Sequence, residues 1–179
     1  MLLSRATIST PLGDMLALAS DEGLCALEFT GPRKRLTRLD ARLARHFPPH
    51  DIVDCDAPPI ARARRWLAEY FDGASADIGD LPLDMRGAEF EKRVWRALTR
   101  IPPGATTSYG AIAKALGSGG ASRAVGAANG ANPVAIIVPC HRVIGSSGSL
   151  TGYGGGLHRK TWLLEHEKRW SLGTQRSLF

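Results

Sequence analysis

The sequence has no long apolar run, no paired cysteines and few acidic residues in its second half. Its longest apolar stretches, such as 134–139, are far shorter than the roughly 20 residues that a membrane span needs, which excludes a membrane-spanning protein. Residues 1–14 contain no apolar core of signal-peptide length, so we expect a cytoplasmic protein. The three cysteines are scattered and none lies in a CxxC pair, which excludes a disulfide scaffold and a typical zinc site.

The composition is that of a globular protein with an uneven charge. Hydrophobic residues make up 44% and charged residues 22% of the 179 positions, which suits one domain or two small ones with a buried core. Residues 1–85 hold 10 Lys and Arg against 13 Asp and Glu, whereas residues 86–179 hold 13 against 4. The second half therefore carries nearly all the attraction for a polyanion such as DNA.

The first half has the pattern of a small α/β domain. Apolar runs at 6–9, 15–19 and 24–29 are separated by tight turns, which predicts an antiparallel meander. Apolar residues at helical spacing predict helices over 33–47 and 57–71. We assign 1–85 to this domain, including a connection that starts at residue 74 and holds a short strand at 81–85.

The second half changes to helices separated by glycine and proline turns, and we assign 86–170 to a second domain. Helices are predicted near 90–98, 108–116 and 122–128. The last two fit either a helix-turn-helix or an ordinary helical hairpin. Residues 121–128 are mostly Ala and Gly, which allows close approach of another molecule, and Arg123 is their one long cation. Residues 171–179 are expected to form a tail of mixed charge with partial disorder.

The segment that carries chemistry is Pro139-Cys140-His141-Arg142, at the end of an apolar run over 134–138 that we expect to be buried. The adjoining His141 and Arg142 are surroundings that can lower a thiol pKa and favour the reactive thiolate. The alternative is an inert core cysteine, which is the interpretation given to Cys25 and Cys55. A phosphatase loop needs arginine where Ser146 stands, and the local signature of papain-like hydrolases is absent.

The sequence IIVPCHRVI, followed by SSGSLTGYGGGLHRKTWLLEHE, resembles the active-site region of the O6-alkylguanine-DNA alkyltransferases. The resemblance extends upstream through PPGATTSYGAIAKALG and SRAVGAANGANP, and it covers residues 88–167 densely. The first half resembles the family in size, meander-plus-helix pattern and its STPLG turn. The resemblance implies an α+β fold, in which a ribonuclease H-like domain with an antiparallel sheet packs on a mostly helical winged helix-turn-helix domain.

The activity implied by this resemblance is DNA repair by a single-turnover enzyme. An alkyl group would pass irreversibly from O6-alkylguanine in double-stranded DNA to Cys140, after minor-groove binding and base flipping, and O4-alkylthymine is a second candidate lesion. No cofactor and no metal are implied, and the protein would be a monomer that can cluster on DNA. The alternatives are a non-catalytic sensor of alkylated DNA or a DNA-binding regulator, and thirdly a cysteine hydrolase.

The resemblance also implies roles for individual residues. Cys140 is the nucleophile, His141 takes the thiol proton through a water, and Glu167 holds the imidazole. Asn132 braces the turn that carries the active-site backbone, and Tyr109 and Lys160 bind the guanine at N3 and O6. Arg123 fills the space that the flipped base leaves. The residues that line the base are Val143, Tyr153, Gly154 and Gly155, and those that bind DNA are Arg123, Tyr109, Ser122, Ala124 and Arg142.

Overall fold

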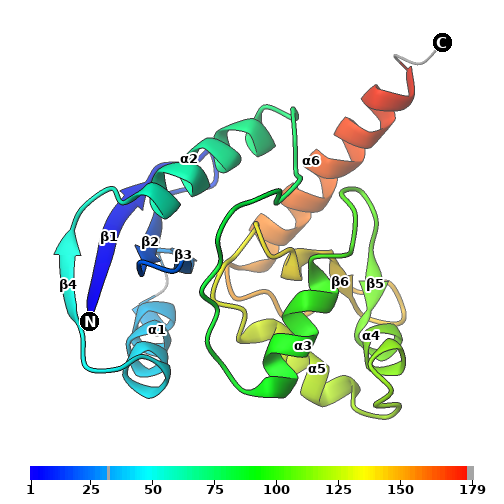
Figure 1. Ribbon diagram of the computed structural model, residues 1–179. Helices are drawn as coiled ribbons and strands as arrows, with labels where there is room; N and C mark the ends of the chain where they lie inside the picture. The colour runs from blue at the N-terminus through cyan, green and yellow to red at the C-terminus, as the bar shows by residue number, and fades with distance from the viewer. Residues whose placement is uncertain (32, 177–179) are drawn as a thin grey trace. The chain divides into compact units, whose positions relative to one another are not determined.

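The computed structural model describes residues 1–31 and 33–176, which divide into two compact units (Figure 1). The first unit is Met1–Gly87 with Pro133–Ile137, and the second is Ala88–Asn132 together with the chain from Val138 onward. The sequence suggested one boundary near residue 85. The structure adds a short return of the chain to the first unit, just before the chain reaches Cys140.

The first unit contains a four-stranded sheet in the order β3-β2-β1-β4. Strands β1 (Leu2–Ile8), β2 (Met15–Ala19) and β3 (Leu24–Phe29) form the predicted antiparallel meander. Strand β4 (Asp51–Asp54) pairs in parallel with β1, so the sheet is mixed. The sequence did not predict β4, because its four residues are all exposed and lack the alternation that marks a half-buried strand.

Two helices cover the two faces of this sheet. Figure 1 shows α1 (Arg33–His46) and α2 (Pro58–Phe71) on opposite sides of the strands. Leu39 and Leu43 of α1 pack in a core cluster with residues of one face, among them Leu18. Successive side chains of a strand point to opposite faces, so the alternate residues of the same strands meet α2. The buried residues of α2 are Pro59, Ile60, Ala63, Trp66, Leu67 and Tyr70.

The connection after α2 is fastened to the β2–β3 turn. Leu83 forms an isolated bridge with Leu24, in place of the short strand expected at 81–85. A side chain at Gly23 would place its Cβ 2.6 Å from the carbonyl of Pro82, so only glycine allows this close approach.

The second unit is mostly helical, as predicted. Its helices are α3 (Glu89–Leu98), α4 (Tyr109–Ala115), α5 (Ser122–Gly130) and α6 (Leu157–Arg176), with a short 3-10 helix η1 (Cys140–Arg142). A parallel pair of two-residue strands, β5 (Thr107–Ser108) and β6 (Val143–Ile144), completes it.

Helices α4 and α5 form the helix-turn-helix. Ser108 caps α4 by accepting a hydrogen bond from the Ala111 amide. Trp95 of α3 is fully buried and donates a hydrogen bond to the Ala128 carbonyl of α5 over 2.9 Å, which fixes α5 against α3. The expected tail at 171–179 continues α6 as far as Arg176, and 177–179 lie outside the described residues. In the described chain no helix is both long and apolar enough to cross a bilayer.

Candidate active site

The chain reaches Cys140 through two very tight turns. Ile136 has a φ of 70°, and the Ile137 amide donates to the Ala135 carbonyl over 2.9 Å. These features define a γ-turn of the rare, strained kind, which a β-branched residue seldom adopts. A second turn of the inverse kind follows at Pro139, where the Cys140 amide donates to the Val138 carbonyl over 2.8 Å. The backbone thereby presents Cys140 at the first position of η1.

Two buried asparagines hold this backbone in place. Asn132 donates from Nδ2 to the Val138 carbonyl over 2.8 Å, and Asn129 donates to the Cys140 carbonyl over 3.3 Å. Both side chains are 2% exposed. The structure thus brings Asn132 to the turn, as its expected bracing role requires. It adds Asn129, whose only sequence signal is a polar residue among the small residues of α5.

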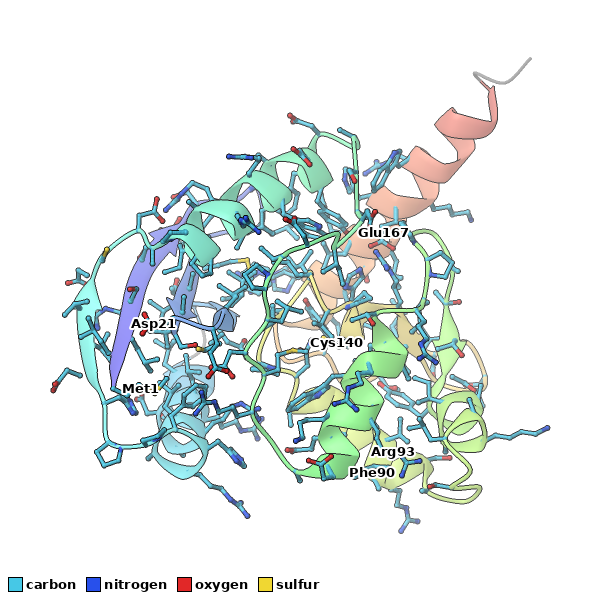
Figure 2. The ribbon with its side chains drawn as sticks, viewed as in Figure 1. Met1, Asp21, Phe90, Arg93, Cys140 and Glu167 are labelled. Carbon is cyan, nitrogen blue, oxygen red and sulfur yellow. The ribbon has the colours of Figure 1, made fainter. Side chains whose placement is uncertain are left out.

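His141 and Glu167 form the centre of a buried polar network. The imidazole Nε2 lies 2.7 Å from Glu167 Oε1, and both side chains are fully buried. Figure 2 shows Cys140 and Glu167 in the second unit, where α6 supplies the carboxylate. The Gly104 amide donates to the other carboxylate oxygen over 3.1 Å. Among the described residues, no hydrogen-bond partner lies at His141 Nδ1, which leaves this atom available as a proton acceptor.

Arg142 completes the network, and this corrects its expected role in DNA binding. Its side chain is 5% exposed, and Nε and Nη2 each donate to Glu167 over 2.9 Å. A third hydrogen bond, from Nη1, goes to the Ile101 carbonyl over 2.5 Å. A guanidinium engaged in this way inside the protein cannot also reach a phosphate, so we assign Arg142 to positioning Glu167.

Burial of this network favours a neutral imidazole. Burial lowers the pKa of His141 below its ordinary value, and the charges of Arg142 and Lys160 lower it further, although Glu167 opposes them. Burial would raise the pKa of Glu167, but hydrogen bonds and charges from His141 and Arg142 outweigh it and hold that pKa far below its ordinary value. Because arginine stays charged, Arg142 keeps Glu167 ionised even when His141 is neutral.

Lys160 is a buried cation close to the cysteine. Its ammonium donates to the carbonyls of Val143 and Thr151 over 2.6 and 2.9 Å. Burial lowers its pKa, and a negative charge on Cys140 raises it. The same attraction acts in both directions, so the ammonium of Lys160 stabilises a thiolate at Cys140. An ammonium has three donors, so one remains for a ligand after these two carbonyls.

Tyr109 donates to the Thr151 carbonyl, which also accepts a hydrogen bond from Lys160. Its hydroxyl donates to Thr151 over 3.3 Å, which is a long and therefore weak hydrogen bond. A Cβ at Gly152 would lie 4.0 Å from the same hydroxyl, so the ring of Tyr109 lies beside the 151–152 backbone. A ligand with a better acceptor can replace Thr151 as the partner of this hydroxyl at small cost.

The residues expected to line the base differ in exposure. Val143 is fully buried and Tyr153 is 9% exposed, with its ring edge to face with His141 at 6.5 Å between centroids. Gly154 is exposed and Gly155 is buried. Sequence reasoning missed Ile101, Gly104 and Thr151, because they act through backbone atoms and no residue pattern indicates them.

Helix α5 exposes a face made almost entirely of small residues. Arg123, Ala124, Ala127 and Gly130 are exposed, whereas Val125, Ala128 and Asn129 point into the protein. Ser122 is half-buried beside Gly110 of α4, where a Cβ would lie 3.5 Å from its hydroxyl. Arg123 is therefore the long cation at the start of a slim, exposed helical face, and this is the shape that entry into a narrow groove requires.

Among residues 1–31 and 33–176, no group of three or more His, Cys, Asp or Glu side chains lies close enough together to hold a metal ion.

Two family models match the two halves of the chain. Residues 3–85 match the "6-O-methylguanine DNA methyltransferase, ribonuclease-like domain", and residues 89–169 match the "6-O-methylguanine DNA methyltransferase, DNA binding domain". A methylated-DNA--protein-cysteine methyltransferase of Mycobacterium tuberculosis is 62% identical over 148 residues, which are 83% of this chain and 89% of that protein. One from Salmonella typhimurium is 45% identical over 166 residues, which are 92% and 95% of the two chains.

The solved structures give the same result for the fold. The M. tuberculosis OGT in complex with DNA has a TM-score of 0.77 and 42% identity, covering 95% of this chain and 94% of its own. The O6-methylguanine-DNA methyltransferase of Pyrococcus kodakaraensis has a TM-score of 0.70 and 28% identity, covering 92% and 98%. Both family models and these relatives agree, and the chain belongs to the 6-O-methylguanine DNA methyltransferase family.

Proposed function

We propose that the protein repairs alkylated DNA by moving the alkyl group of O6-alkylguanine onto Cys140. The observation that carries this assignment is the buried group of side chains Cys140, His141, Arg142 and Glu167. Within it, the imidazole Nδ1 has no hydrogen-bond partner among the described residues. A nucleophile, a base and a group that orients the base are the parts an activated thiol needs. The names of the relatives support the same reaction.

The chemical step starts with the proton of the thiol. His141 Nδ1 accepts it through a water, and Nε2–H keeps its hydrogen bond to Glu167, so the positive imidazolium faces a fixed carboxylate. The thiolate then attacks the alkyl carbon. A carbon–sulfur bond forms, the carbon–O6 bond breaks, and its electron pair stays on the guanine. Tyr109 and Lys160 donate hydrogen bonds to the leaving base, where the negative charge develops.

The base must leave the duplex before Cys140 can reach it. Extruding a nucleotide costs a few kcal/mol, least for a damaged base. The exposed small-residue face of α5 enters the minor groove, and Arg123 fills the vacated stack. Val143, Tyr153, Gly154 and Gly155 line the extruded base. The thioether has no route back to a thiol, so one protein molecule, acting as a monomer, repairs one lesion.

Mass spectrometry after incubation with a duplex that contains one O6-methylguanine tests this function. We expect a gain of one methyl group on the peptide that holds Cys140 and none on the peptides of Cys25 and Cys55. Cys140→Ser should accept no methyl group and keep its affinity for DNA, since the thiol contributes to chemistry and little to binding. Binding without transfer by the wild-type protein would instead indicate a sensor or regulator, and repeated turnover without an adduct would indicate a hydrolase.

A further inference from the structure

Helix α1 is strongly basic within an acidic part of the chain. Its 14 residues, Arg33–His46, include six Lys and Arg and one Asp. The rest of residues 1–85 holds four Lys and Arg against twelve Asp and Glu. Cations that served only solubility would be spread over the surface and mixed with acids. Their concentration on one helix indicates a negatively charged partner.

Three of these arginines form a stripe along one side of α1. Arg38, Arg42 and Arg45 are spaced i, i+4 and i+7, so they lie on the same face of the helix. Arg38 and Arg45 are exposed, and Arg42 is half-buried and donates to the Arg86 carbonyl. Leu39 and Leu43 turn the other side of the helix into the core. The stripe extends over about 10 Å of helix axis, at 1.5 Å per residue.

Within the described residues no acid neutralises Arg38 or Arg45 of this stripe, whereas comparable arginines nearby in sequence are neutralised. Arg62 of α2 pairs with Asp80 at 3.1 Å, and Arg64 pairs with Asp56 at 3.2 Å. Arg38 and Arg45 have no ion-pair partner in the described part of the chain. Like charges at i, i+4 destabilise a helix. A bound anion would remove this penalty.

We propose that the α1 stripe (Arg38, Arg42 and Arg45) binds the sugar-phosphate backbone of double-stranded DNA, as a contact additional to that of α5. The proposal rests on the proposed function, which brings the protein to DNA. The stripe presents three cations over about 10 Å, which is long enough to reach more than one phosphate of a strand. Arginine forks suit phosphate oxygens, and contacts of this kind carry no sequence preference.

The test compares two double variants that remove the same charge. Arg38→Gln/Arg45→Gln removes the two exposed cations of the stripe, and Arg62→Gln/Arg64→Gln removes two cations that pair with acids on the same unit. Glutamine keeps the side chain long and has a similar helix propensity. The affinity for an undamaged, fluorescein-labelled duplex is measured by anisotropy at several salt concentrations, and the melting temperatures show whether both variants fold.

The stripe variant should have a shallower salt dependence. Each lost phosphate contact lowers the slope of log K against log[salt] by about 0.9, so two lost contacts lower it by about 1.8. The control variant should keep the wild-type slope. An unchanged slope for the stripe variant, or an equal decrease in both variants, would overturn the proposal. A stripe variant that lost only the cooperativity of DNA binding would also overturn the proposal, because the stripe would then contact a second copy of the protein.

This outcome is separate from that of the repair assay. If wild-type protein took no methyl group from O6-methylguanine DNA, the proposed function would be wrong, and the slopes would still report whether α1 binds phosphates. If the wild type took the methyl group and the slopes did not differ, only the role of α1 would be wrong.

Discussion

Replacing Arg142 with methionine should change how the reaction depends on pH as well as how stable the protein is. The guanidinium makes two hydrogen bonds to Glu167 and one to the Ile101 carbonyl. Without it, Glu167 loses its arginine partner, and the buried carboxylate retains its contacts with His141 and the Gly104 amide. Breaking a buried ion pair in this way costs about 3–5 kcal/mol, a large part of a typical stability of roughly 5–15 kcal/mol.

The lost stability is measurable as a melting temperature. For a chain of this size, 1 kcal/mol corresponds to about 2–4 °C, so Arg142→Met should melt about 6–20 °C lower. The pH effect has a different cause. The charge of Arg142 lowers the pKa of His141, and the charge of Glu167 raises it. Arg142→Met removes one of the two cations that oppose the carboxylate, so the pKa of His141 rises and the base is protonated at a higher pH.

The assay is the rate of transfer from free O6-benzylguanine to the protein, followed by mass spectrometry at several pH values below the melting temperature. The acid side of the profile should move to higher pH in Arg142→Met and return toward the wild type in Arg142→Lys, which restores the charge. Arg86→Met is the matched control, because Arg86 also donates twice to one buried carboxylate, Asp84. If Arg142→Met were destabilised with the wild-type pH profile, Arg142 would have a structural role only.

Much of the fold could be predicted because its signals are local. Tight turns separate the first three strands, and apolar residues recur at helical spacing in α2, α3 and α4. Strand β4 has no such signal, since its residues are exposed and its partner β1 lies about 50 residues earlier. The run over 134–138 was predicted to be buried and is, but its γ-turns depend on hydrogen bonds that side-chain patterns do not indicate.

Arg142 is a second case in which the sequence pattern does not indicate where a side chain lies. The sequence places a cation directly after Cys140 and His141, and the family resemblance implied a DNA-binding role for it. The direction of a side chain in a three-residue helix depends on what it meets, and Arg142 meets a carboxylate 25 residues further along the chain. A buried charge needs a partner of opposite sign, so the inward position of Glu167 requires Arg142 to turn inward as well.

Three further predictions concern protonation and packing. The pKa of folded His141 lies below its ordinary value of 6.5, so the unfolded chain binds a proton at this histidine before the folded chain does. The free energy of unfolding should therefore fall as the pH drops below about 6.5. Urea titrations at several pH values should show a smaller fall in His141→Gln. Burial raises the pKa of Cys25 to about 11, whereas Cys55 is exposed. Iodoacetamide near neutral pH should therefore modify Cys55 and leave Cys25 unmodified until the protein is denatured. Modification of Cys25 in the folded protein would contradict its burial. Alkylation should destabilise the protein, because Cys140 is 7% exposed and follows the buried residues Ile137 and Val138, so an added methyl group has to displace packed atoms. Overpacking costs about 1–3 kcal/mol, or about 2–12 °C in melting temperature, and a benzyl adduct should cost more than a methyl adduct because it adds more volume. A melting temperature that the benzyl adduct leaves unchanged or raises would mean that the space beside Cys140 already accommodates the group and that packing does not oppose it.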